Sequence, residues 1–127
     1  MDILLLWLMI ANITLLSMHE TDAAYWKEWR LFGSWGSSLA DRTGLTIFVL
    51  ARIPIYLLLL SGLVFLNSAY GRSVSIFFSG FLIFHFIIHM IYKRKGSEEF
   101  DWPISYITQF AMLAVSLVQL TVTFFLV

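Results

Sequence analysis

The strongest constraint on this chain is a set of four apolar segments, each about long enough to cross a bilayer as a helix. They cover about residues 3–20, 43–67, 73–92 and 102–126, with polar segments between them. A transmembrane helix needs about 20 mainly apolar residues because the hydrocarbon core is about 30 Å thick. The pattern therefore predicts an all-α, four-helix transmembrane bundle that forms a single integral membrane domain over residues 1–127.

The composition supports a membrane location and narrows the chemistry. Of the 127 residues, 60% are hydrophobic and only 13% are charged, and the formal net charge is zero. A chain without excess positive charge is not expected to bind nucleic acid. The sequence contains no cysteine, so a metal ion would have to be bound by imidazole and carboxylate groups.

The first apolar segment is expected to remain as an uncleaved helix. It is preceded by Asp2 rather than by a basic residue, and no small-residue cleavage site comes before His19. The polar stretch that follows could continue this helix or form an interfacial helix, with Trp26 and Trp29 in an aromatic belt. A cluster of Gly and Ser at residues 33–38 then predicts a break.

The distribution of Lys and Arg predicts the orientation in the membrane. Basic residues gather in the segments after the first and third spans, whereas the opposite side carries only Arg72. By the positive-inside rule, both termini lie outside (N-out and C-out) and the two basic segments are cytoplasmic. This topology is expected for the inner membrane of a bacterium.

Several ionisable residues lie inside or at the ends of the apolar segments and are predicted to share one depth. Arg52 lies about 13 Å along the second helix from Thr43. His85 and His89 are four residues apart and therefore lie on one face of the third helix. His19 stands at the cytoplasmic end of the first helix. We therefore expect all three histidines of the chain to meet in the cytoplasmic half of the bundle.

This convergence predicts a site for a divalent metal ion, namely zinc, iron or manganese. The candidate ligands are His19, His85, His89 and Glu20, because neutral imidazole and carboxylate groups bind these metals. The protein could then be a membrane enzyme that acts on a lipid or another apolar substrate. In that hypothesis Glu20, Asp22 and Arg52 are the catalytic candidates: an acid serves as ligand or general base, and the guanidinium orients an anionic group.

Structural roles for the same residues remain open. Arg52 could simply pair with Glu20, Asp22 or Asp41. His19 could be an interfacial or helix-end partner. The other histidines could hydrogen-bond to the fourth helix, which carries a stripe of Ser, Thr and Gln residues, with Met112 among them, at intervals of four and three: Ser105, Gln109, Met112, Ser116, Gln119 and Thr123. That stripe is predicted to face the bundle interior.

Two other functions also remain open. A haem or quinone protein would need His19 opposite the histidines of the third helix, because those two share one face and cannot clamp both sides of one haem. A non-enzymatic carrier, channel subunit or accessory protein would use the polar stripe as a path or an interface. Since four spans are few for a monomeric pore, that function predicts a homo-oligomer or a larger membrane complex.

The segment from His19 to Trp29, HETDAAYWKEW, resembles small uncharacterised four-span bacterial membrane proteins that carry an H-E-x-D-A segment after their first helix. More weakly, it resembles the H-x-x-E-E family of membrane proteins, for which a metal-dependent catalytic role has been suggested. This chain has Asp22 and no paired glutamates at that position. The resemblance implies a four-span layout, and the second family implies metal-dependent chemistry.

Overall fold

The computed structural model describes residues 3–94 and 102–125, and their regular structure is entirely helical. The elements are α1 (Ile3–Tyr25), η1 (Glu28–Leu31), α2 (Gly33–Ser38), α3 (Asp41–Val64), α4 (Ala69–Arg94) and α5 (Pro103–Phe125). Four of these helices are long and apolar enough to cross a membrane. The predicted all-α, four-helix architecture is thus confirmed, and the chain is a multi-pass membrane protein.

The helices differ from the predicted spans mainly at their ends. α1 extends to Tyr25, beyond the predicted end at residue 20. α3 ends at Val64, because residues 65–68 form the turn into α4. α4 continues through Arg94, so basic residues expected in a loop lie in its last turn. The prediction followed hydropathy, but a helix continues into the polar region wherever its backbone groups stay hydrogen-bonded.

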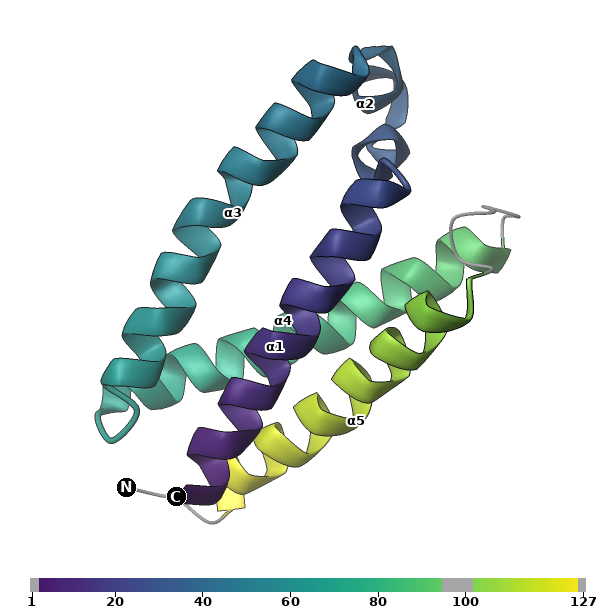
Figure 1. Cartoon of the computed structure of the whole chain (residues 1–127). Coiled ribbons are helices and arrows are strands. Elements are labelled where there is room, and N and C mark those ends of the chain that lie inside the picture. The colour runs from purple at the N-terminus through teal and green to yellow at the C-terminus, as the bar shows by residue number, and fades with distance from the viewer. Residues whose placement is uncertain (1–2, 95–101, 126–127) are drawn as a thin grey trace.

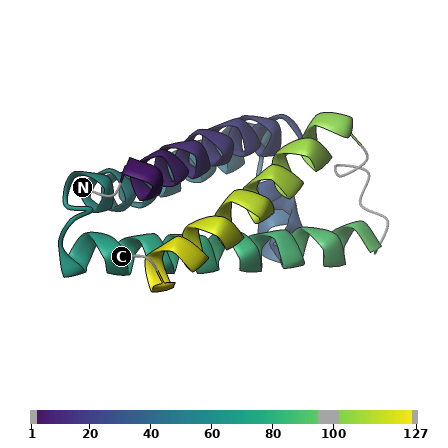
Figure 2. The same cartoon turned by 90° about the horizontal axis from the view of Figure 1, so that it is seen from below.

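α1, α4 and α5 form the packed centre of the bundle (Figures 1 and 2), with α5 against both other helices. α3 joins α4 through the short turn and diverges from it toward the end where α2 lies (Figure 1). In its middle and at the end where α1 begins, the core combines large apolar side chains with the buried polar residues described below. Its most deeply buried apolar side chains include Leu5, Met9, Leu59, Phe78, Leu82 and Met112.

The polar stripe of α5 faces the interior, as predicted. All six of its residues are buried, and their exposed fractions range from 0% to 6%. Near the end of α5, Gln119 binds both neighbouring helices: Asn12 Nδ2 donates to its Oε1 over 2.7 Å, and its Nε2 donates to Ser75 Oγ over 2.9 Å. In an apolar solvent these hydrogen bonds have no competing water, so they fix α5 against α1 and α4.

Because the bundle has four spans, α1 must begin and α5 must end on the same side of the membrane, and the structure has this arrangement. The first residues of α1 and the last residues of α5 lie at one end, together with the α3–α4 turn (Figure 1). η1 and α2 lie at the other end. The Gly and Ser cluster at residues 33–38, where the sequence predicts a break, instead forms the short helix α2, and the chain turns at its first residue, Gly33, whose φ is +66°. The placement of η1 and α2 in the membrane interface and the N-out orientation remain predictions.

α3 and α4 approach closely next to their connecting turn, at Gly62. A Cβ atom on this glycine would lie 2.4 Å from Val74 Cγ1 and 2.7 Å from Val74 Cβ. These distances are far below van der Waals contact, so any side chain would separate the two helices. Gly80, also in α4, has no atom within 4 Å of its Cβ position and is exposed.

We expect Gly62→Ala to lower and Gly80→Ala to preserve or raise the melting temperature of the purified protein. Overpacking costs about 1–3 kcal/mol, whereas replacing an unhindered helical glycine with alanine gains about 0.5–1 kcal/mol. The measurement is thermal unfolding by circular dichroism in one detergent. Equal melting temperatures for the two variants would contradict the close approach of α3 and α4.

Candidate metal centre

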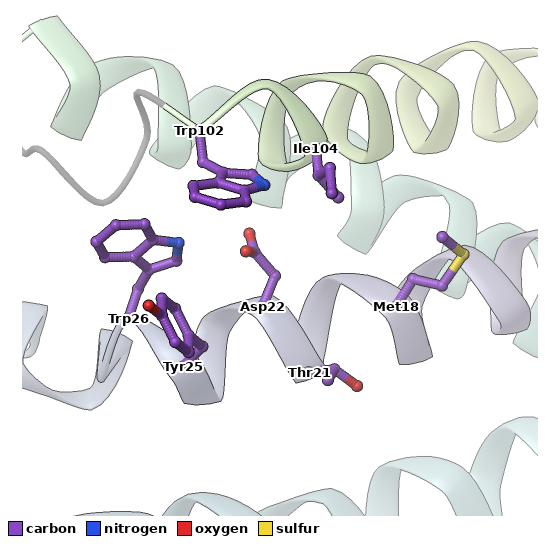
Figure 3. Close-up of a pocket in the computed structure, with 7 residues that line it drawn as sticks. All are labelled: Met18, Thr21, Asp22, Tyr25, Trp26, Trp102 and Ile104. Atoms are coloured by element: carbon purple, nitrogen blue, oxygen red, sulfur yellow. The ribbon is translucent and has the colours of Figure 1, made fainter.

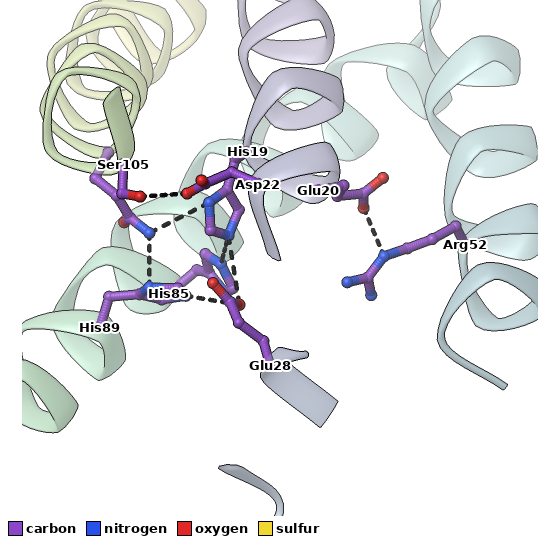
Figure 4. Close-up of polar contacts among 9 residues, drawn as sticks. His19, Glu20, Asp22, Glu28, Arg52, His85, His89 and Ser105 are labelled. Carbon is purple, nitrogen blue, oxygen red and sulfur yellow. Dashed lines mark hydrogen bonds and ion pairs between the residues drawn. The ribbon is translucent and has the colours of Figure 1, made fainter. Parts of the chain in front are cut away.

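Three imidazole rings meet where α1 passes α4 (Figure 4). His19 comes from α1, and His85 and His89 come from successive turns of α4. The Nε2 atoms of His19 and His85 are 2.8 Å apart, and one nitrogen from each of the three rings falls within a group no wider than 4.8 Å. His19 and His89 are 2% and 3% exposed. The predicted meeting of the three histidines is confirmed.

The spacing of these nitrogens is close to that of metal ligands. Two nitrogens bound tetrahedrally at about 2.0–2.1 Å from zinc lie roughly 3.3 Å apart. The observed separations, from 2.8 Å to at most 4.8 Å, lie on both sides of this value. Small side-chain rotations would therefore suffice to bring the three nitrogens around one ion.

Gln109 of α5 contacts the far sides of two of the rings. Its Nε2 atom is 2.7 Å from Nδ1 of His89 and 3.4 Å from Nδ1 of His19, and its Oε1 is buried without a hydrogen-bond partner in the described residues. In this orientation the amide donates to Nδ1. Rotated by 180°, it would accept from two Nδ1–H groups and leave both Nε2 lone pairs for a metal.

The chain reverses direction after α1 and brings the carboxylate of Glu28 next to the histidines. Lys27 adopts a left-handed conformation, with φ 57° and ψ 44°, which ends the helix and directs η1 back toward the bundle. Trp29 then packs at the start of α3, against Phe48 at a ring distance of 5.8 Å. It lies on Gly44, where a Cβ atom would be 2.1 Å from its Nε1. This packing holds the preceding residue, Glu28, in place.

Glu28 is only 8% exposed, and its Oε2 lies 3.7 Å from His89 Nε2 and 3.9 Å from His19 Nε2. With the two α4 histidines it lines a cavity of about 320 Å³. The remaining walls are mostly apolar: Leu31, Phe32, Ile88 and Tyr92. The imidazole cluster is thus bordered by a carboxylate and opens toward an apolar pocket.

The predicted catalytic candidates lie outside this cluster. Glu20 faces α3, where its Oε1 forms an ion pair of 2.9 Å with Arg52 Nε, and the guanidinium also stacks 3.8 Å from the Phe48 ring centre. Asp22 accepts a hydrogen bond from Ser105 on α5. Of the three counter-ions suggested for Arg52, the structure therefore places Glu20 beside it, while Asp41 pairs with Lys27 and Arg30.

The structure thus brings together the three predicted histidines, but not Glu20, Asp22 and Arg52, and it adds two residues that were not proposed as site residues. The polar stripe of α5 was expected as a possible hydrogen-bond partner of the α4 histidines, and the structure confirms this contact between Gln109 and His89. Glu28 gave no periodic signal, because its burial depends on the chain reversal at Lys27.

A comparison with protein families found a match over residues 5–126, to a model described as a family of unknown function (DUF6713). Comparisons with curated proteins and with solved structures gave no match.

A further prediction concerns the Glu20–Arg52 ion pair and is independent of any metal. The two side chains are 13% and 28% exposed, so we expect a coupling free energy of about 1 kcal/mol, at the upper end for accessible ion pairs. A double-mutant cycle with Glu20→Gln, Arg52→Ala and the double variant measures it from unfolding free energies. Strictly additive effects would show that the pair does not stabilise the fold.

Proposed function

This chain belongs to the DUF6713 family, and we propose that it is a membrane protein that binds a divalent metal ion through His19, His85 and His89. The observation that carries the proposal is the convergence of one nitrogen from each imidazole within 4.8 Å, inside the bundle. Burying ionisable groups in a membrane costs free energy, and such groups usually mark functional sites. A shared cation would serve as the partner of all three rings.

The donor set supports zinc, iron or manganese. Imidazole nitrogen and carboxylate oxygen suit these ions, and no thiolate is available because the chain has no cysteine. A haem is less compatible with the geometry. The Nε2 atoms of His19 and His85 are 2.8 Å apart, and the two rings meet edge to face at 4.9 Å. A planar macrocycle could not lie between them without moving α1 away from α4.

The surroundings favour a catalytic over a purely structural site. Three protein ligands and one open position are typical of catalytic zinc, whereas structural zinc has four protein ligands. A metal ion there would lower the pKa of a bound water toward about 7. Glu28 lies beside the histidines, where its carboxylate would serve as a general base, and the apolar cavity next to it suits a lipid chain or another small apolar substrate.

The non-enzymatic carrier or channel is less well supported. The residues of the α5 stripe are buried and largely hydrogen-bonded to side chains of α1 and α4, so their polar groups are used for packing. The resemblance of the segment around His19 to bacterial proteins supports a bacterial inner-membrane location. A homo-oligomer or a larger complex remains compatible with the exposed apolar surface of α3.

We expect purified protein to contain close to one equivalent of zinc, iron or manganese, and His85→Ala and His89→Ala each to lose it. Each substitution removes one of only three imidazole ligands. Arg52→Ala is the matched control, because its guanidinium pairs with Glu20, which faces α3 and lies outside the imidazole cluster. Elemental analysis of detergent-purified protein, with a visible absorption spectrum to detect haem, is the measurement. Equal metal content in all variants would refute the site.

A second test concerns the orienting role of Gln109. If its carbonyl accepts from the Nδ1–H groups of His19 and His89, Gln109→Leu should weaken metal binding by about 10- to 100-fold. Gln109→Glu should bind at least as tightly as the wild type, because a carboxylate accepts both hydrogen bonds. Competition with a chromogenic chelator measures the affinities. A comparable loss in both variants would show that Gln109 contributes only packing.

A further inference from the structure

Three aromatic rings and a carboxylate line one cavity at the end of the bundle where α1 ends and α5 begins (Figure 3). Tyr25 and Trp26 meet at a right angle with ring centres 5.2 Å apart, and Trp26 and Trp102 meet at 60° with centres 6.3 Å apart. Rings at these angles do not stack on one another, so they form adjoining walls. With Asp22 they line a cavity of about 390 Å³.

The carboxylate of Asp22 points into the space between Trp26 and Trp102 (Figure 3). Its Oδ2 accepts a hydrogen bond from Ser105 Oγ. Among the described residues no Lys, Arg or His lies within ion-pair distance of it, in contrast to Glu20, Glu28 and Asp41. A half-buried carboxylate at the end of a membrane span thus lacks a cation from the described part of the chain.

This cavity is separate from the imidazole cluster. Its remaining lining residues are Met18, Thr21 and Ile104, and it shares no residue with the cavity beside Glu28. It contains a single carboxylate and no imidazole, a poor donor set for a metal ion. Faces of aromatic rings, however, attract organic cations through the negative potential of their π systems, and Trp does so most strongly.

We propose that Tyr25, Trp26, Trp102 and Asp22 form a binding site for an alkylammonium group. The carboxylate supplies the countercharge and the rings replace the water around the methyl or methylene groups. The site lies at the ends of two spans, where ammonium headgroups of phospholipids are found. Trp26 Nε1 is buried without an acceptor in the described residues, and its N–H suits a phosphate oxygen. The cation can come from such a lipid or from a free amine.

The first experiment measures soluble cations. Tetramethylammonium and ethylammonium are titrated into maltoside-solubilised protein by calorimetry, beside 3,3-dimethylbutanol, an uncharged molecule with a similar apolar shape. Asp22→Asn should weaken cation binding by about tenfold or more through loss of the countercharge. Trp102→Leu should weaken it by about fivefold. Trp7→Leu is the control, because Trp7 is 63% exposed and lies near the opposite end of α1.

The second experiment identifies the source. The protein is reconstituted in nanodiscs with equal amounts of phosphatidylcholine, phosphatidylethanolamine and phosphatidylglycerol, and the retained lipids are counted by native mass spectrometry. Retention of the ammonium lipids by wild-type protein, with loss in Asp22→Asn, identifies a headgroup site. Binding of the soluble cations without such retention identifies a site for free amines.

The proposal is overturned if 3,3-dimethylbutanol binds as tightly as the cations, if Asp22→Asn changes neither cation nor lipid binding, or if neither class of ligand binds. It does not depend on the metal site. His89→Ala should keep ammonium binding, and Asp22→Asn should keep bound metal, so the failure of either proposal can be recognised separately. Circular dichroism of each variant confirms that the helices are intact.

Discussion

The bundle depends on two glutamines of α5 that each join α1 to α4. Gln119 hydrogen-bonds to Asn12 on one side and Ser75 on the other. Ten residues earlier, Gln109 contacts a histidine from each of the same two helices. In hydrocarbon an amide has no water to bind, so its hydrogen bonds must come from neighbouring helices. The need to satisfy these amide groups therefore fixes the helix packing around Gln119 and aligns the imidazoles around Gln109.

The fold could be predicted because its causes are local in sequence. The lengths of the apolar segments set the number of helices, and the four-and-three spacing of polar residues set the buried face of α5. The helix ends were predicted less well, since hydropathy reports the membrane boundary while the hydrogen-bonded backbone continues past it. α1 shows this most clearly, because it carries His19 and Asp22 within one unbroken helix that ends at Tyr25.

The site was only partly predictable, and Glu20 and Glu28 show why. Adjacent residues on a helix point about 100° apart, so Glu20, next to His19, faces α3 and pairs with Arg52. Once α1 is known to be helical through this segment, that separation follows from geometry. Glu28 instead reaches the imidazoles through a left-handed residue and the packing of Trp29 on Gly44. Those are tertiary contacts, which no periodicity reveals.

Three carboxylates follow His19 within ten residues, and different contacts stabilise each of them near the hydrocarbon. Glu20 receives a guanidinium from α3. Glu28 lies against two imidazoles, whose charge state and metal binding decide how its own charge is balanced. Asp22 has a hydroxyl partner and aromatic walls, which cannot supply positive charge. A carboxylate near hydrocarbon needs a countercharge, and among the described residues Asp22 has no Lys, Arg or His within ion-pair distance. The proposed ammonium site would supply that charge from outside the chain.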